Sequence, residues 1–582
     1  MERHLQRAWV AWAAIAAAIL AVYLPALGSP FQYDDIHSIV ENSHLRTLAH
    51  LDDFFWRPEM FSADPKGAMY RPLVLVSYAI NYALGGYEVA GYRAFNIAVH
   101  LGNALLLCEL VRRWMGSGAA GLAAGLVFAL HPVAGEPVNY ISSRSESLSA
   151  LCVLAALVLY ARARDGGAHY WGSVAACAGA VLAKAIGVVT PVALLLIDVV
   201  KGRSHKSALR YYAGFAAVGG AYLLIVRQAL QTAVVEHPVR GLGVQILTQT
   251  KVLVYYLKLL WVPLGQSVEH QIAPVRDAGA PALWAALALV ASLTGAVVWL
   301  WARDRRLAFW IVAPALFLAP TFVVPLNVLA NEHRLYIPVL GFAAIAGWLF
   351  TAGVPQGRGP ALLVALVLVL GVLSYERSRV WRSPETLWAD ARAKAPLMPR
   401  PHLYMGDVYK SQGHNREALA AYQRALAVNP TLLSGGDLLS IYNNTGAVHL
   451  ALGNNEEATR WYHLALQLDP DYAKAREALA ALEALAEVEH HPDAEALYKK
   501  GMQWLVSGQL DRAGADLQKS LALQRHPKVY QALGLVHERA GDKSAAVAAY
   551  KALLQMPGVQ PSLAHGARQR LAALRGEESG LE

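Results

Sequence analysis

Cysteine is scarce in this chain of 582 residues, which has only three. Cys108, Cys152 and Cys177 all lie inside apolar runs, and their spacing fits neither a metal site nor a reactive thiol pair. We expect inert thiols that are buried in a core or face lipid. The cysteines therefore carry no information about the compartment of the protein.

Charged residues are also few. They make up 16% of the chain, against about 25% in a typical soluble protein, and 55% of the residues are hydrophobic. The apolar excess lies before about residue 375, so the chain has two parts with different solvent preference. The net charge is +9, but much of the Lys and Arg excess sits in short loops between apolar runs. That pattern indicates membrane topology and not a nucleic-acid partner.

Three sets of catalytic signatures are missing from the sequence. It has no Gly-rich nucleotide-binding loop, no Gly-x-Ser-x-Gly motif and no Cys/His metal set. Soluble nucleotides are therefore not the expected substrates. His131 and Glu136 are two candidate metal ligands without a third, so a divalent metal is unsupported and no cofactor is predicted to be required.

Long apolar runs predict a polytopic membrane domain, since a bilayer core needs about 20 apolar residues per helix. The first run, Ala8 to Leu27, is too long for a signal peptide and is interpreted as a retained span. A further apolar stretch, 246–264, is predicted to be re-entrant or interfacial. The eleven predicted spans are 8–27, 94–111, 119–133, 146–161, 170–184, 186–200, 209–227, 280–301, 307–326, 335–352 and 359–375.

Orientation follows from Lys and Arg in the short loops. Fourteen cations fall on one side if the N-terminus is cytoplasmic, and eleven crossings then put the C-terminal part outside. Short loops and Ala-rich spans favour a bacterial protein, so we predict an inner-membrane protein whose outer side is the periplasm. The fourteen are Arg3, Arg7, Arg112, Arg113, Arg162, Arg164, Lys201, Arg203, Lys206, Arg210, Arg303, Arg305, Arg306 and Arg358.

The C-terminal part shows a tetratricopeptide period of 34 residues. Four repeats are predicted at about 399–432, 439–472, 494–527 and 527–560, with Gly at the eighth position and Ala at the twentieth of each. We therefore predict an all-α chain, with a polytopic membrane domain at 1–380 and a soluble helical solenoid at 381–582. Such arrays present a concave face to peptides or proteins, although a purely structural stalk is the alternative.

Polar motifs recur at the predicted outer ends of the spans. The acids suit proton abstraction and the cations suit an anionic lipid headgroup. Taken singly, the acids could be solvated turns and the cations could snorkel. The motifs are Tyr33-Asp34-Asp35, Tyr70-Arg71-Pro72, His131-Pro132 with Glu136, Arg144, Ala183-Lys184, and Glu332-His333-Arg334-Leu335-Tyr336-Ile337-Pro338.

In this order, these motifs resemble the transmembrane and tetratricopeptide-repeat O-mannosyltransferase family, and the resemblance covers nearly the whole chain. It implies a membrane glycosyltransferase with the C-type fold, a polyprenyl-phosphate-linked sugar as donor, and an inverting transfer to protein Ser or Thr on the periplasmic or lumenal face. The implied roles are a general base at Asp34 with Asp35 beside it; contacts to the lipid phosphate by Arg71, Lys184 and Arg334; and a sugar or acceptor pocket formed by His131, Glu136, Arg144, Glu332 and Tyr336.

The sequence departs from the family pattern at two positions. Glu146 stands where the family commonly has Asp, and Ala185 stands where it often has Glu. The sugar and the acceptor class therefore stay open. One alternative is transfer of a sugar or oligosaccharide to a lipid or cell-envelope polymer, and another is a non-enzymatic membrane-anchored scaffold. A transporter is disfavoured, because its polar residues would lie near the bilayer midplane.

Overall fold

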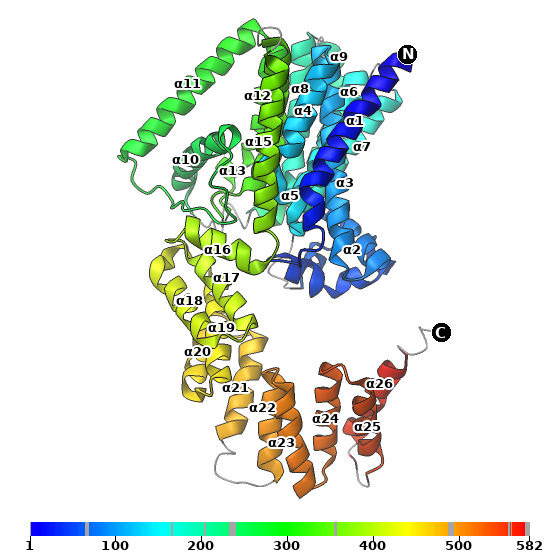
Figure 1. The fold of residues 1–582 in the computed structure, drawn as a ribbon, viewed down its shortest axis with the longest axis vertical. Coiled ribbons are helices and arrows are strands. Elements are labelled where there is room, and N and C mark those ends of the chain that lie inside the picture. The colour runs from blue at the N-terminus through cyan, green and yellow to red at the C-terminus, as the bar shows by residue number, and fades with distance from the viewer. Residues whose placement is uncertain are drawn as a thin grey trace. The chain divides into compact units, whose positions relative to one another are not determined.

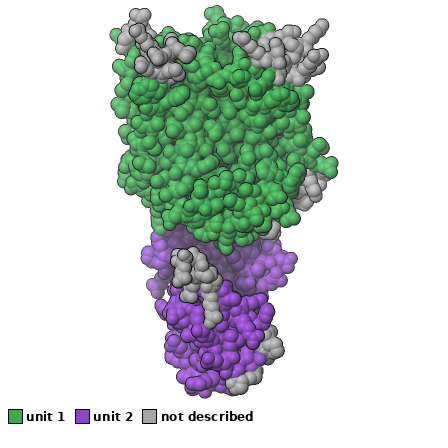
Figure 2. Space-filling model, turned by 90° about the vertical axis from the view of Figure 1, so that its right-hand side faces the viewer, with its two compact units in different colours: residues 1–401 green, residues 402–582 purple. Residues whose placement is uncertain are grey.

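The computed structural model describes residues 2–63, 69–163, 167–202, 205–231, 240–326, 328–353, 358–486, 494–556, 559 and 561–576. It divides into two compact units, residues 1–401 and residues 402–582 (Figure 2). All regular structure in the described residues is helical, which confirms the predicted all-α class.

The first unit is built from helices α1 to α16, joined by short 3₁₀ and π turns. Their bounds are α1 Glu2–Tyr23, α2 Pro72–Gly85, α3 Val89–Met115, α4 Gly118–Leu130, α5 Glu136–Asn139, α6 Arg144–Arg162, α7 Ala168–Ala183, α8 Thr190–Lys201, α9 His205–Gln231, α10 Leu242–Trp261, α11 Pro281–Arg303, α12 Arg305–Leu316, α13 Pro320–Val323, α14 Tyr336–Trp348, α15 Gly359–Val380 and α16 Pro384–Lys394. Figure 1 shows α11 standing apart from the other long helices.

Seven helical stretches of the described residues are long and apolar enough to cross a bilayer. An eighth results if Gly118–Leu130 and Pro132–Asn139, bent by 61°, form one broken span. The first unit is therefore a membrane-spanning helical bundle. The seven stretches are Trp9–Ala26, Val89–Met115, Ile141–Arg162, Pro281–Arg303, Arg305–Val323, Glu332–Gly353 and Gly359–Val380.

The structure thus supports fewer full-length spans than the eleven predicted. The other three predicted spans, 170–184, 186–200 and 209–227, correspond to α7, α8 and α9. Helices α7 and α8 have 16 and 12 residues. At a rise of 1.5 Å per residue they reach about 24 and 18 Å, short of a hydrocarbon core of about 30 Å. The apolar described part of α9 is Tyr212–Arg227.

The stretch 246–264, predicted to be re-entrant or interfacial, forms most of helix α10. This helix is not among the seven apolar stretches. It buries polar side chains, including Gln245, Thr248 and Gln249, against the loops around α13. Its composition is therefore that of a helix packed inside protein rather than one surrounded by lipid.

Close helix packing in the bundle depends on glycine. A Cβ added at Gly121 would lie 2.5 Å from the Cys108 carbonyl oxygen of α3, and one at Gly341 would lie closer still to the Trp310 carbonyl oxygen of α12. Real Cβ atoms do not approach backbone oxygens so closely. Small residues let helix backbones touch in this way in many membrane bundles.

The long loop after α1 folds onto α2. Residues 36–61 form five short 3₁₀ or π turns, and Ile39, Leu45 and Phe54 pack with Val74 and Tyr78 of α2 in a separate apolar cluster. The loop is therefore a folded part of the first unit. Residues 72–82 form most of α2, and Val74, Leu75, Tyr78 and Ala79 of this helix belong to the cluster.

The segment after the last span belongs to the first unit. Trp381 is buried and stacks on Tyr140 at a centroid distance of 5.4 Å, and Trp388 of α16 contacts Tyr33 edge to face at 5.7 Å. The units therefore divide after residue 401 and not after the predicted residue 380. Hydropathy alone cannot find such a boundary, because α16 is polar in composition and is held by these aromatic contacts.

The second unit is a solenoid of paired antiparallel helices. An added Cβ at Gly406 or Gly446 would lie 2.5 or 2.9 Å from the ring of Tyr422 or Tyr462. The small residues of the repeat therefore allow the partner helix to pack closely. The pairs are α17 Pro399–Ser411 with α18 Asn415–Val428, α19 Gly435–Ala451 with α20 Asn455–Leu468, α22 Ala494–Val506 with α23 Leu510–Leu523, and α24 Pro527–Arg539 with α25 Lys543–Leu554; α21 Ala473–Ala486 and α26 Pro561–Gly576 are single helices.

Candidate functional site

The two predicted carboxylates have opposite exposures. The side chain of Asp34 is 45% exposed, and one of its oxygens lies 3.5 Å from Nε2 of His37. The backbone amide of Asp34 donates to the Tyr140 hydroxyl at 3.1 Å, which fixes the turn. Tyr33, just before it, has a φ of 54°, the only positive φ of a non-glycine residue in the described part of the chain. Such backbone strain is concentrated at functional sites.

Asp35 is fully buried and binds two backbone amides. Its Oδ1 accepts from the amide and the hydroxyl of Ser142, at 2.8 and 2.6 Å, and its Oδ2 accepts from the amide of Gln32 at 3.1 Å. Burial raises the pKa of Asp35 to about 6, although the hydrogen bonds from Ser142 act in the opposite direction. Asp35 therefore joins the loop after α1 to the segment that leads into α6, and it has no oxygen exposed to a substrate.

The three cations predicted to contact a lipid phosphate lie close together. Arg71, Lys184 and Arg334 all interact electrostatically with His333. Arg71 donates to the Ser145 hydroxyl at 3.4 Å, and Arg334 donates to the carbonyls of residues 328 and 329 at 2.8 and 3.0 Å. Each comes from a different part of the chain: the start of α2, the end of α7 and the start of α14. The cluster therefore forms only on folding.

Two glutamates neutralise part of this cluster. Glu146 forms an ion pair with Lys184, and its Oε1 also lies 3.8 Å from Nε2 of His333. The other ring nitrogen of His333 is 2.7 Å from Oε1 of Glu136. His333 thus bridges the two acids, which come from the starts of α5 and α6.

Glu332, next to His333 in the chain, has a different set of partners. Its Oε1 accepts from the Ser267 amide at 2.6 Å and lies 3.7 Å from His270, and its Oε2 lies 3.9 Å from Arg377. Burial, with the charge of Arg377 second, lowers the pKa of His270 to about 3, so this imidazole is neutral at neutral pH. Arg377 is then the cation that balances Glu332.

Arg144, predicted to line a sugar or acceptor pocket, is an internal residue. Arg144 is completely buried, and its guanidinium donates to Asn96, Ser77, Asn81 and the Tyr92 carbonyl at 2.7 to 2.9 Å. Its donors are committed to these partners, so the structure does not support a pocket role.

His131 and Tyr336 are internal for the same reason. The ring of His131 contacts the Leu260 carbonyl at 3.1 Å and accepts from the Val133 amide at 3.3 Å. The Tyr336 hydroxyl lies 2.7 Å from Nδ1 of His100 and accepts from Asn103 at 3.1 Å. Both side chains are fully buried, so each stabilises the bundle below the site and does not face a substrate.

Sequence reasoning missed several residues that the fold brings into this region. Glu146 was noted only as a departure from the family pattern, although it is the partner of Lys184. Arg377 was overlooked because a cation at the end of an apolar run normally only snorkels. It forms ion pairs with Glu332 and Asp390, the latter at 3.1 Å. Within the described residues, no group of three metal-ligating side chains is present.

Comparisons with known proteins place this geometry in context. Family models described as tetratricopeptide repeat match residues 403–473 and 527–557. The Caenorhabditis elegans protein O-mannosyl-transferase F38B6.6 is 24% identical over 70% of this chain and 61% of its own length. Human protein O-mannosyl-transferase TMTC4 is 25% identical over 71% and 66%, and human TMTC3 is 21% identical over 88% and 65%. The resemblance inferred from the motifs is confirmed.

The chain spans less than two thirds of the length of these relatives, between 61% and 66%. The alignment with human TMTC3 covers 88% of this chain and therefore includes residues of both units. Among solved structures, the APC/C hetero-tetramer Cut9–Hcn1 matches 91% of this chain at 13% identity with a TM-score of 0.18, too low to indicate a shared fold.

Proposed function

We propose that this chain is an inverting membrane glycosyltransferase of the C-type class. It transfers a sugar from a polyprenyl-phosphate carrier to Ser or Thr hydroxyls of acceptor proteins. The names of its relatives, protein O-mannosyl-transferases, support protein O-glycosylation. The proposal places the reaction on the periplasmic face of an inner membrane, with a cytoplasmic N-terminus, and it requires no metal.

The proposal rests on the contacts of residues 140–146. Its Tyr140 and Ser142 bind the backbone amide of Asp34 and the carboxylate of Asp35. Its Ser145 and Glu146 bind Arg71 and Lys184. One short stretch of chain therefore holds an accessible carboxylate on one side and the cation cluster on the other. Transfer of a sugar from a phosphate carrier needs both groups: a base for the acceptor hydroxyl and cations for the departing phosphate.

The chemistry assigns one role to each side. Asp34 accepts the proton of the acceptor hydroxyl as the hydroxyl oxygen bonds to the anomeric carbon. The bond from that carbon to the phosphate oxygen breaks, and polyprenyl phosphate leaves with the electron pair. Arg71, Lys184 and Arg334 stabilise the negative charge on the departing phosphate. Attack opposite the leaving group inverts the anomeric configuration.

The repeats are proposed to recruit the acceptor protein. Tetratricopeptide arrays bind extended peptides on a concave face. In the first pairs, Asp407 accepts from Tyr422 and Asn444 at 2.7 and 2.8 Å, and Lys410 donates to Asn444 at 2.8 Å. This polar network fixes the side chains of neighbouring helices, so any binding face there is preorganised.

The test is a transfer assay with the full chain in detergent, polyprenyl-phosphate-linked mannose as donor, an acceptor protein, and glycopeptide mass spectrometry. Asp34→Asn should reduce transfer by about 10²- to 10⁴-fold, as loss of a general base does. Asp52→Asn, an exposed acid in the same loop, is the matched control and should be fully active. Equal activity of wild type and Asp34→Asn would refute the assignment of the base.

A further inference from the structure

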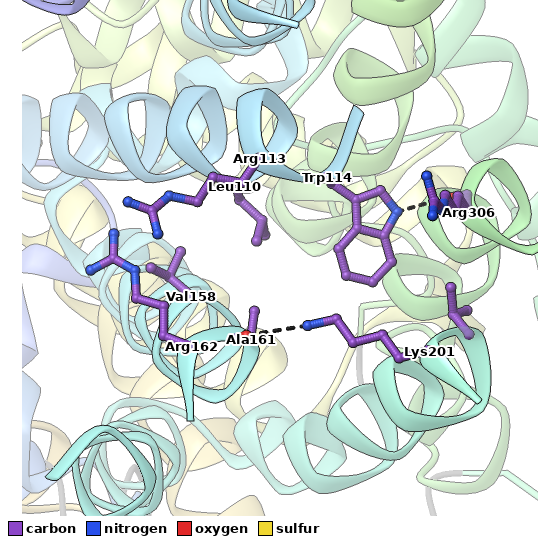
Figure 3. A pocket seen from close by; sticks show the side chains of 9 residues that line it. Leu110, Arg113, Trp114, Val158, Ala161, Arg162, Lys201 and Arg306 are labelled. Atoms are coloured by element: carbon purple, nitrogen blue, oxygen red, sulfur yellow. Dashed lines mark hydrogen bonds between the residues drawn. The ribbon is translucent and has the colours of Figure 1, made fainter. Parts of the chain in front are cut away.

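A second polar region lies at the other end of the bundle. A cavity of about 690 Å³ opens between the ends of α3, α6 and α8 and the start of α12. Four cationic side chains surround it: Arg113, Arg162, Lys201 and Arg306 (Figure 3). Trp114 lies on the same wall as Arg306.

This cavity is far from the candidate transferase site. Helix α3 connects the two regions: near its first turn Arg93 donates to the Asn139 carbonyl below the site, and near its last turn Arg113 lines the cavity. The helix has 27 residues, which corresponds to about 40 Å. A ligand in the cavity therefore cannot contact Asp34 or the cation cluster around His333.

Among the residues that the structure describes, three guanidinium groups at this end of the bundle share one carboxylate. Glu109 pairs with Arg113 and with Arg112, and lies 3.6 Å from Arg162. One carboxylate therefore serves three guanidinium groups, and two of those line the cavity.

Arg306 has no such partner. The nearby carboxylate of Asp304 caps α12 by accepting from the amides of Arg306 and Leu307, at 2.9 and 3.1 Å. In the part of the chain that the structure describes, the guanidinium of Arg306 forms no hydrogen bond or ion pair. Clustered like charges repel, so the arrangement is most stable when an anion occupies the cavity.

The remaining wall is apolar and carries a tryptophan. Leu110 and Val158 line the cavity, and the ring of Trp114 stacks on Phe309 at a centroid distance of 4.6 Å. The indole N–H of Trp114 donates to the Arg306 carbonyl at 3.2 Å, which holds the ring at the rim. Tryptophan at a helix end, beside Arg and Lys, is typical of the lipid headgroup level.

We propose that this cavity binds the phosphate of an anionic phospholipid headgroup. The cations contact the phosphate oxygens, and the acyl chains leave along the apolar wall beside Trp114. Basic pockets between membrane helices bind headgroups in this way. Free inorganic phosphate offers the same charge without the chains, so the test separates the two sources. The site is independent of the proposed transferase activity.

The experiment is native mass spectrometry of the delipidated full chain in detergent, titrated with phosphatidylglycerol, with phosphatidylcholine of the same chains, or with inorganic phosphate. Wild type should retain at least five-fold more phosphatidylglycerol than phosphatidylcholine. Arg306→Gln should lower that ratio two- to three-fold, and Arg162→Gln combined with Arg306→Gln should bring it close to one. Arg303→Gln is the matched control, because Arg303 lies at the same end, over the ring of Trp299, outside the cavity.

Three results would overturn the proposal. The first is equal retention of the two lipids by wild type. The second is an equal loss in the Arg303→Gln control and in the cavity variants, which would mean a diffuse surface effect. The third is saturable binding of inorganic phosphate without any preference for phosphatidylglycerol, which would assign the cavity to a soluble anion. Arg306→Gln removes a side chain without internal partners, so the single variant is expected to fold even if the double variant does not.

Discussion

Replacing Asp35 with Asn should remove a pH dependence of stability. Burial raises the pKa of this carboxyl from 3.8 to about 6, so between these values the folded protein holds a proton that the unfolded chain has released. Stability contributed by Asp35 is therefore greatest below pH 4 and is lost as the pH rises to about 6. The gap corresponds to about 3 kcal/mol at about 1.36 kcal/mol per pH unit.

The assay is thermal unfolding of the full chain in detergent, followed by intrinsic fluorescence, between pH 4 and 7.5. The substituted amide does not titrate, so the wild type should lose stability relative to Asp35→Asn between pH 4 and 6 and then run parallel to it. The substitution also places an amide against the Gln32 amide, which lowers stability equally at every pH. Asp34→Asn is the control and keeps the wild-type profile. A wild-type curve parallel to that of Asp35→Asn throughout would refute the burial argument.

Two further substitutions test the packing. Arg144→Lys should destabilise the bundle by about 1–3 kcal/mol or more, because an ammonium has three donors and leaves at least one of the four partners unsatisfied. Thermal unfolding in detergent measures this, and an unchanged midpoint would contradict it. Gly341→Ala should cost about 1–3 kcal/mol or prevent folding, because its Cβ would meet the Trp310 carbonyl. Gly295→Ala, inside α11 with no atom within 4 Å, should be neutral or slightly stabilising.

Much of the fold follows from periodicity in the sequence. The 34-residue period predicted Gly406 and Gly446 at the small eighth position of their repeats, and in the structure a Cβ at either position would meet a tyrosine of the partner helix. Apolar runs located the long spans to within a few residues. They could not distinguish a full span from a shorter helix such as α8, because both are apolar and only the position of the end residues differs. They also could not assign α16 to the membrane unit, since its aromatic contacts are with residues far away in sequence.

The candidate site was only partly accessible to sequence reasoning. The motif order predicted a shared face, and the structure brings Arg71, Lys184 and Arg334 around His333. The type of a polar residue does not reveal, however, whether its side chain points toward the site or into the bundle. Arg144 belongs to one of these motifs, yet its side chain points into the bundle. A helix of 3.6 residues per turn separates neighbours by about 100°, so one residue can face the site while the next is a core residue.

The ion pair between Lys184 and Glu146 allows the phosphate role of Lys184 to be separated from a structural one. Lys184→Gln alone leaves Glu146 buried without a cation, which should lower both stability and donor use. Adding Glu146→Gln removes that uncompensated charge, and the double variant should recover most of the lost stability, measured by thermal unfolding.

If Lys184 contacts the lipid phosphate, the double variant still lacks the cation that the donor requires. Its KM for the polyprenyl-phosphate sugar should stay raised or its kcat should stay low, although its stability has returned. Lys184→Arg keeps the charge and should retain part of the activity. Recovery of both stability and donor use in the double variant would show that the only role of Lys184 is to neutralise Glu146. The phosphate site would then be assigned to Arg71 and Arg334 alone.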